Sequence, residues 1–275
     1  MSQYDADAFA AFEAAGWERQ AASYEAGVGR VTSRVFDRLL DAAHVRHGSA
    51  VLDVACGPGE ISARAAARGA HVIGTDIAGA MIERARLAYP AIDFRQAAAE
   101  DLPFRYGGFD CTVAGFLFLH LARPDKVASE LARILASGGR AAATVWDAPE
   151  QNRYLGVVFD AIEAAGATPP RDLPAGPPIF GFADEAVFAR LLEDAGFSDV
   201  TVETVAFTEH FSSTDELWNG IMRGAVRLPP LVLAQPEPVQ RAIRARVERL
   251  LDEHRVGDGF DVPVSVKLAS GTSGR

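Results

Sequence analysis

The stretch Val51-Leu-Asp-Val-Ala-Cys-Gly-Pro-Gly59 decides the fold that this sequence predicts. An apolar run with strand character, Ala50 to Val54, breaks at a glycine-bearing turn, and helix-forming sequence follows over residues 61–68. A strand that turns directly into a helix is the repeating unit of an α/β sheet. Ligands bind at such junctions, because glycines let a ligand approach the backbone and the first N–H groups of the helix are free to donate.

A dinucleotide site is one interpretation of this turn, but its usual motif has a third small residue three places after Gly59. Ser62 stands there instead. A Gly-x-Gly pair is also common in turns that bind nothing. Asp53 favours a ligand, because a carboxylate near the end of a buried strand needs a partner to offset its desolvation. A cationic or donor-rich ligand would supply that partner.

The segment Asp53-Val-Ala-Cys-Gly-Pro-Gly59 resembles the first motif of class I S-adenosylmethionine (SAM) dependent methyltransferases. Roughly from Trp17 to Phe211, the chain is similar to the branch that contains ubiquinone/menaquinone and many natural-product methyltransferases. The resemblance implies an α/β fold with a doubly wound, mostly parallel, seven-stranded Rossmann-like sheet and a helical cap. It implies SAM as cofactor, S-adenosylhomocysteine as its product, and methylation of a small molecule in biosynthesis.

The resemblance also implies a set of cofactor-binding residues at the ends of several strands. We expect SAM to contact Tyr24, Asp53, Ala55, Gly57, Gly59, Asp76, Ile77, Met81, Ala98, Ala99, Glu100 and Gly115. Asp76 ends a predicted strand, His71 to Asp76, where its oxygens can accept from the ribose hydroxyls of any adenosine ligand, NAD included. Capping of the next helix is the alternative role for Asp76, and simple packing is the alternative for Tyr24 and Met81.

Two positions depart from the family pattern. Ala98-Ala-Glu-Asp-Leu-Pro-Phe104 resembles the motif whose loop holds adenine, but its first acid, an acceptor for the adenine amino group, is Ala98 here. Adenine recognition would then fall to the backbone of residues 98–100. Gly115 stands where the family often has Ser or Asn.

The rest of the chain predicts a single domain, 1–275, with N-terminal helices at 1–45, a SAM-binding core at 46–150 and cap insertions at 151–182 and 212–256. A helix over residues 9–24 is expected to lie over the cofactor. Further strands are expected at 91–97, 109–115, 140–146, 200–211 and 262–268, and disorder at 270–275. The substrate pocket is expected to include Tyr24, residues 116–120, Trp146, Phe180 and Trp218.

Composition and charge set aside several classes of function. The chain has 275 residues, 49% of them hydrophobic, and can bury one large core. Its net charge of −10 argues against nucleic acid and favours a small, neutral or cationic substrate. Cys56 and Cys111 have no paired spacing, so neither a disulfide framework nor a metal site is expected. Without a signal-peptide pattern or a membrane-length apolar run, we expect a cytoplasmic monomer or homodimer with no membrane partner.

His120 is the candidate catalytic residue. A sulfonium methyl is already activated, so the protein need only align the acceptor, exclude water and take up a proton where the acceptor carries one. The loop after the fourth strand borders the methyl group in this fold, and imidazole titrates near neutral pH. A packed structural histidine is the alternative, and His210 is a weaker candidate.

Two other classes of function stay open. An enzyme of this fold can bind SAM yet catalyse a cyclisation or another non-methylating reaction, because function depends on the site and not on the fold. A NAD-dependent enzyme or a non-catalytic binding module is the other alternative, and the missing third glycine disfavours NAD.

Overall fold

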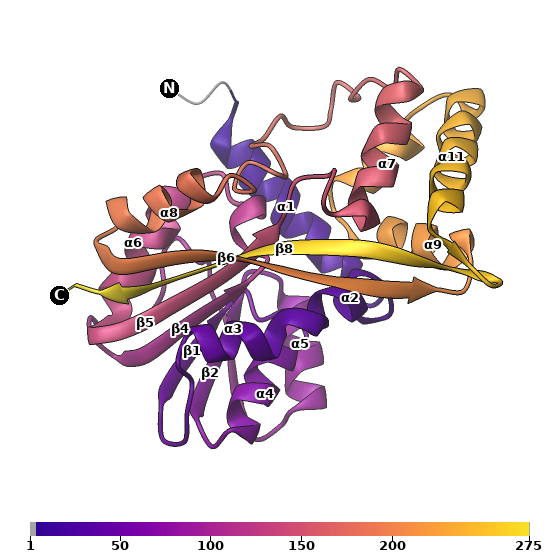
Figure 1. Ribbon diagram of the computed structural model, residues 1–275. Coiled ribbons are helices and arrows are strands. Elements are labelled where there is room, and N and C mark those ends of the chain that lie inside the picture. The colour runs from indigo at the N-terminus through magenta and orange to yellow at the C-terminus, as the bar shows by residue number, and fades with distance from the viewer. Residues whose placement is uncertain (1–3, 275) are drawn as a thin grey trace.

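The computed structural model describes residues 4–274, which form one twisted sheet with helices on both faces (Figure 1). The spatial order of the strands is β3-β2-β1-β4-β5-β8-β6, with β7 paired to β8. Strands β1 to β5 are parallel, and β8 runs antiparallel to its neighbours β5, β6 and β7. The strands are β1 Ala50–Val54, β2 His71–Asp76, β3 Asp93–Gln96, β4 Phe109–Gly115, β5 Leu135–Trp146, β6 Phe197–Phe211, β7 Arg255–Val256 and β8 Gly259–Ser273.

Helices cover both faces of the sheet. Figure 1 shows α3 and α4 on one face and α6 and α8 on the other. The helices of the N-terminal part and the core are α1 Ala6–Gln20, η1 Glu25–Gly29, α2 Arg30–Thr32, η2 Ser33–Val35, α3 Phe36–Ala42, α4 Glu60–Ala67, α5 Gly79–Ala88, η3 Phe118–His120, α6 Pro124–Ile134 and α8 Glu185–Asp194. Because parallel strands covered on both faces are buried throughout, β1 is continuously apolar apart from Asp53, and Val51, Leu52 and Val54 are fully buried.

The order of the strands places a binding site. The chain leaves β1 on one side to form β2 and β3, and returns on the other side as β4 and β5. The carboxyl ends of β1 and β4 are therefore neighbours whose connections diverge, which is where ligands bind in open α/β sheets. The turn quoted first, after Val54, lies at this point.

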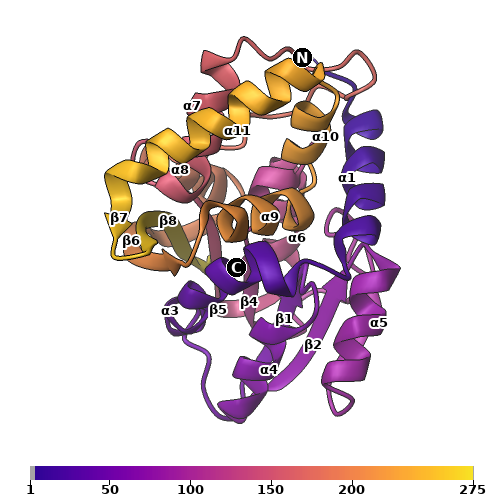
Figure 2. The same ribbon diagram turned by 90° about the vertical axis from the view of Figure 1, so that its right-hand side faces the viewer.

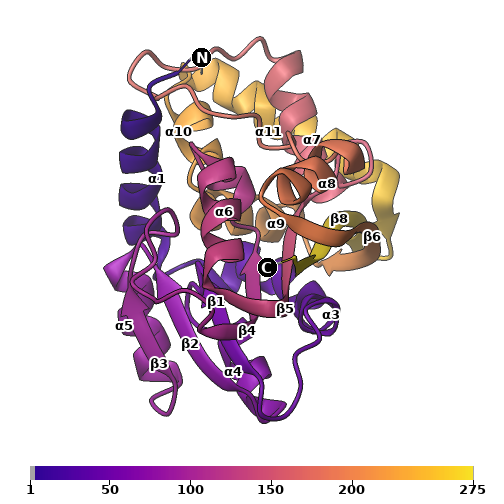
Figure 3. The same ribbon diagram turned by 90° about the vertical axis from the view of Figure 1, so that its left-hand side faces the viewer.

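A second group of helices packs around the far end of the long β6–β8 ribbon, whose pairing runs from Phe197 with Ser273 to Phe211 with Phe260. These helices are α7 Arg153–Ala164, α9 Thr214–Gly224, α10 Leu228–Leu233, α11 Glu237–Leu251 and η4 Asp252–His254. Helix α7 contacts α11, and α9 contacts η1. Figures 2 and 3 show α1 standing along one side of the molecule, from the level of α10 down to α5.

Glycines bring the N-terminal segment and α9 into backbone contact. A Cβ on Gly27 would lie 2.3 Å from the carbonyl oxygen of Gly220, and one on Gly224 would lie 2.8 Å from the backbone nitrogen of Val28. Neither position has room for a larger side chain. Helix α1 begins where the Asp5 side chain accepts from the N–H groups of Asp7 and Ala8, so its start is fixed by a cap.

The predicted α/β fold is confirmed, and strands β1, β2 and β4 coincide with the ranges predicted. Two details were wrong. Within residues 4–274 the sheet has eight strands and not seven, because the two-residue β7 also pairs with β8. Residues 270–273 are ordered: Ser270 and Ser273 are buried, since β8 continues between β5 and β6 as far as Ser273. The segment consists of small residues, which fit between the two flanking strands. Because a disordered tail has a similar composition, the sequence alone did not distinguish the two.

Deleting residues 271–275 should destabilise the protein. The deletion removes the pairs of Gly271 and Thr272 with β5 and of Thr272 and Ser273 with β6. At about 0.5–1.5 kcal/mol per hydrogen bond, we expect a loss of about 2 kcal/mol or more and a Tm about 4–8 °C lower. Calorimetry checks this, with deletion of Arg275 alone as the control. An unchanged Tm in the longer deletion would show that the end of β8 adds no stability.

Candidate active site

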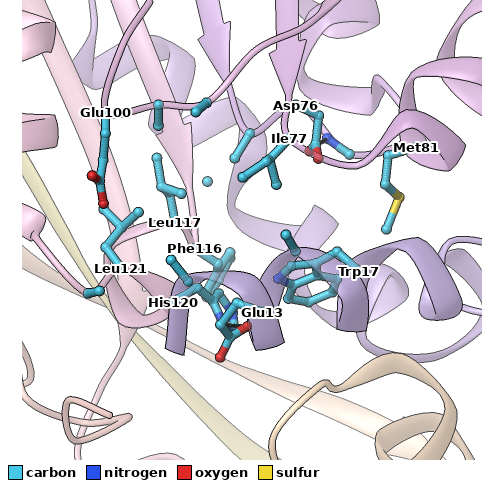
Figure 4. A pocket seen from close by; sticks show the side chains of 18 of the residues that line it. Glu13, Trp17, Asp76, Ile77, Met81, Glu100, Phe116, Leu117, His120 and Leu121 are labelled. Carbon is cyan, nitrogen blue, oxygen red and sulfur yellow. Dashed lines mark hydrogen bonds and ion pairs between the residues drawn. The ribbon is translucent and has the colours of Figure 1, made fainter. Parts of the chain in front are cut away.

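A cavity of about 360 Å³ lies between the carboxyl ends of the parallel strands and α1 (Figure 4). Its volume is in the range of small-molecule sites. Of the residues predicted to form the site, the cavity wall contains Tyr24, Ala55, Gly57, Asp76, Ile77, Met81, Ala98, Ala99, Glu100, Gly115 and His120. The structure thus gathers most of the predicted residues around a single space.

The two glycines of the first turn have different environments. Gly57 has a φ of +53°, and a Cβ there would meet nothing within 4 Å, so its backbone is open to the cavity. A Cβ on Gly59 would lie 2.8 Å from Phe94, and Gly59 is outside the cavity wall. Gly59 therefore serves the close packing of the turn on β3, in a backbone conformation (φ +93°) that favours glycine.

Asp53 has a protein partner in place of the ligand expected from the sequence. The Ser62 hydroxyl donates to Oδ2 of Asp53 at 2.6 Å, and both side chains are fully buried. Oδ1 has no hydrogen bond to any described residue, and Asp53 is not part of the cavity wall. Burial raises the pKa of Asp53 to about 7. Ser62, at the position of a third glycine, is explained by this bond.

Asp76 both stabilises the turn and faces the cavity. Its Oδ2 accepts from the N–H of Gly57 and its Oδ1 from the N–H of Ala78, each at 2.9 Å. Burial raises the pKa of Asp76 to about 6, against the effect of these two bonds. Each carboxylate oxygen keeps a further lone pair, so Asp76 can still accept from a ligand. The helix-capping alternative for Asp76 is wrong, because the first N–H groups of α5, those of Gly79 and Ala80, donate to Glu18.

His120 lies across the cavity from Asp76, beside Glu13 and Trp17 of α1 (Figure 4). Its Nδ1 is 3.1 Å from Oε2 of Glu13, and its ring meets the Trp17 ring edge-on, with centroids 4.9 Å apart. Glu13 is only 4% exposed. His120 is therefore a cavity residue with a buried carboxylate partner, a contact that a simple packed histidine does not require.

Comparisons with known proteins agree with this geometry. Residues 52–143 match the sequence family described as a methyltransferase domain. A demethylmenaquinone methyltransferase of Paenarthrobacter aurescens is 28% identical over 176 residues, covering 61% of this chain and 70% of that protein. Residues 52–143 therefore form a methyltransferase domain of the SAM-dependent class. Its cofactor is SAM.

Two further similarities describe the extent of the likeness. An uncharacterized protein of Mycobacterium tuberculosis is 35% identical over 144 residues, which cover 51% of this chain and 50% of that protein, so the chain spans only half of its length. The structure of protein BH2331 of Bacillus halodurans has a TM-score of 0.57 and 20% identity, covering 87% of this chain and 99% of that one. At that identity it shows the shared fold.

The charges in the cavity wall suit a cationic cofactor such as SAM. Four acids, Asp7, Glu13, Asp76 and Glu100, share the wall with one arginine, Arg123. Arg123 is itself paired with Asp7 at 2.5 Å and with Glu100 at 3.4 Å. The remaining wall is mainly apolar, so the site attracts positive charge and offers little to a phosphate.

Two other predicted site residues, Tyr24 and Gly115, have close contacts inside the protein. Tyr24 donates to or accepts from Thr32 across 3.3 Å, and burial raises its pKa to about 12, so it stays neutral in the wall. A Cβ on Gly115 would lie 2.6 Å from Cδ1 of Ile61, so a larger side chain there would require the end of the Ile61 side chain to move.

Three residues that were candidates for the site, Phe180, Trp218 and His210, lie outside the cavity wall. Phe180 packs against Phe159 with ring centroids 5.1 Å apart, and Trp218 lies under Arg244 at 5.2 Å. Neither belongs to the cavity wall, and among the described residues of 151–182 and 212–256 none does. His210 is exposed and bonds Asp261 at 2.8 Å on the β6–β8 ribbon. The expectation that the cap insertions form the pocket wall therefore fails for this cavity, because α1 occupies that place.

The sequence analysis did not predict Glu13 as a site residue, although the pattern of α1 gave an indication of it. It follows Phe9 by four residues on α1 and precedes Gly16 by three, and all three are buried. A carboxylate on the buried stripe of an amphipathic helix needs a partner nearby. Its sequence position alone did not show whether that partner was a ligand, an arginine or His120.

Asp53→Asn should flatten the dependence of stability on pH when SAM is absent. A folded-state pKa of about 7, above the unfolded value of 3.8, means that wild-type stability is greatest below the unfolded pKa and falls as pH rises through the folded one. Between about pH 4 and pH 8, the free energy of unfolding of the variant relative to wild type should rise by on the order of 2–4 kcal/mol.

Denaturant unfolding at several pH values measures this. Ser62→Ala is the matched control, because it keeps the carboxyl group but removes the hydroxyl that lowers its pKa. Its stability should continue to fall to higher pH than that of wild type. Parallel pH profiles for wild type and Asp53→Asn would contradict the assignment.

Proposed function

We propose that this protein transfers the methyl group of SAM to a small, largely apolar acceptor that carries a hydroxyl or another ionisable proton. The observation that supports this best is the division of the cavity. Figure 4 shows Asp76 and Ile77 at one end of the cavity and Leu117, Leu121 and His120 at the other, and the wall also includes residues 97–100. The first part suits an adenosine cofactor, and the second suits an acceptor molecule.

The cavity fits SAM better than NAD on electrostatic grounds. A pyrophosphate would bring two negative charges into a wall with four acids and one arginine, and no described residue there offers a free cation to it. SAM brings a sulfonium and an ammonium group. Asp76 would accept from the ribose hydroxyls while it holds the turn, and the peptide groups of Ala98 and Ala99, which are in the cavity wall, would contact the base.

The residues of this chain have clear tasks in such a reaction. SAM supplies a methyl group on a sulfonium leaving group, so no further activation of the donor is needed. Helix α1 covers the cavity with Ala10, Ala14 and Trp17 and so limits the access of water. Phe116 and Trp146, with ring centroids 4.3 Å apart, form an aromatic wall against which an acceptor can be aligned. Nε2 of His120 would take the proton that the acceptor loses.

The apolar part of the wall limits the class of acceptor. It includes Phe116, Leu117, Leu121, Ala122 and Trp146, with His120 as its titratable group. A flat, hydroxylated ring system would bury its apolar faces there and present one hydroxyl to the imidazole. The similarity to a demethylmenaquinone methyltransferase supports an acceptor of this kind.

A cytoplasmic location is also part of the proposal. Cys56 and Cys111 are both buried and unpaired, as is usual in a reducing compartment. Within residues 4–274, no helix combines the length and apolar character needed to cross a bilayer.

SAM and S-adenosylhomocysteine should both stabilise the protein, and NAD should not. The acid-rich wall repels a pyrophosphate, whereas SAM and S-adenosylhomocysteine share an adenosine and an ammonium group, and SAM adds the sulfonium charge. Titration calorimetry with the three ligands measures this, and Asp76→Ala should bind SAM about 10- to 100-fold more weakly, because hydrogen bonds to a charged acceptor are lost. Stabilisation by NAD alone would overturn the cofactor assignment.

His120→Asn should lower the rate of methyl transfer by about 10²-fold or more while leaving SAM affinity nearly unchanged, because it removes a proton acceptor and not a cofactor contact. Release of S-adenosylhomocysteine from SAM with a panel of phenols and demethylmenaquinone measures the rate. His210→Asn, on the exposed ribbon, is the matched control and should retain full activity. A product formed without consumption of SAM would favour the cyclisation alternative, and a fully active His120→Asn would remove the imidazole from the mechanism.

A further inference from the structure

We infer that Glu13 is the positioning residue for His120: its buried carboxylate holds the imidazole in the tautomer that carries its proton on Nδ1, which leaves Nε2 as a proton acceptor facing the cavity. This inference rests on the proposed function, since an acceptor nitrogen matters only if the reaction releases a proton. It concerns two residues from separate parts of the chain, α1 and η3, that meet at one point of the cavity wall.

The contact between them has the geometry of a hydrogen bond. Nδ1 of His120 lies 3.1 Å from Oε2 of Glu13. The side chain of Glu13 is 5% exposed and that of His120 is 18% exposed, so the pair is shielded from solvent on the carboxylate side and accessible on the imidazole side. Trp17 meets the imidazole at an interplanar angle of 90°, which restricts rotation of the ring.

The chemistry of the two groups then fixes the tautomer. An ionised carboxylate can only accept hydrogen bonds, so the nitrogen that faces it must carry the proton. In a neutral imidazole the other nitrogen is then an acceptor. Nε2 has no hydrogen bond to any residue between 4 and 274, and His120 contributes to the cavity wall. The acceptor nitrogen is therefore left for a molecule in the cavity.

Arg227 explains how Glu13 can be both buried and charged. Its Nε lies 4.0 Å from Oε1 of Glu13, the oxygen that has no hydrogen bond among the described residues. Arg227 is held by the carbonyl oxygen of Pro177 at 2.8 Å and lies over the ring of Phe9. Burial lowers the pKa of Arg227, and Glu13 acts against that effect. Arg227 thus places a positive charge beside the Glu13 oxygen that does not contact His120.

Heteronuclear NMR of the imidazole nitrogens tests the inference without any substrate. In the full-length wild-type protein, well above the usual range of imidazole titration, His120 should show a protonated Nδ1 and an unprotonated Nε2. The His120→Asn spectrum assigns the signal. A wild-type His120 with its proton on Nε2 would overturn the inference, whatever the Glu13 variant does.

Glu13→Gln is the decisive variant. The amide keeps the shape of the side chain, but it can donate as well as accept, so it no longer dictates the tautomer. The ratio of the two tautomers should shift by about 10-fold or more toward Nε2–H, because a hydrogen bond to a charged group is lost. Glu18→Gln is the matched control: Glu18 is on the same helix, but it accepts from Gly79 and Ala80 of α5, and it should leave the tautomer unchanged. An unchanged ratio in Glu13→Gln would reduce Glu13 to a packing role.

Kinetics separate this inference from the proposed function. If methyl transfer is measured, Glu13→Gln should lower kcat by about 10-fold or more with little change in the affinity for SAM, because positioning and not binding is lost. A tautomer shift in Glu13→Gln together with no methyl transfer by wild type would reject the proposed function and leave the positioning of His120 intact. A full kcat in Glu13→Gln despite the shift would show that the tautomer does not matter for turnover.

Discussion

The carboxylate of Asp76 is the interaction on which this site depends most. It joins the turn after β1 to the start of α5, because one oxygen accepts from Gly57 and the other from Ala78. Without it, two backbone N–H groups near the ends of neighbouring strands would lose their acceptor, and the open conformation of Gly57 would lose its support. The same carboxylate faces the cavity. The geometry of the turn and the capacity to bind a ligand are therefore set by one side chain.

Helix α1 gives the cavity its second half and connects the core to the cap. Glu18 accepts from the first N–H groups of α5, while Glu13 contacts His120 of the core and Arg227 of the cap. The segment after α1 meets α9 through close glycine contacts that leave no space for a side chain. A displacement of α1 would thus disturb the Glu13–His120 contact and the cap together, so the cover of the cavity and the orientation of its imidazole are mechanically linked.

The sequence predicted the parts of this architecture that depend on local pattern. The strands before and after the first glycine turn, and most of the cofactor residues, follow from apolar runs and from a resemblance carried by a few motifs. Contacts between distant segments could not be predicted in this way. Glu13 and His120 are separated by 107 positions, and the local sequence around either residue does not indicate that the two are in contact. Ser62 looked like a missing glycine, although it is the donor to Asp53.

The buried acids explain why such a site should be less stable empty than filled. Burial raises the pKa of Asp53 to about 7 and that of Asp76 to about 6, so near neutral pH each carries or nearly carries a charge that its surroundings disfavour. A well-packed apolar residue in place of Asp76 would make a more stable fold, at the expense of an acceptor for a ligand. A cation in the cavity offsets part of the penalty through Coulomb attraction and so stabilises the folded chain by mass action. The unfavourable burial of these carboxylates therefore contributes both to the affinity for SAM and to the lower stability of the empty protein. The neutral Tyr24 and the apolar wall keep water away from the cavity, so the charges there are only weakly screened.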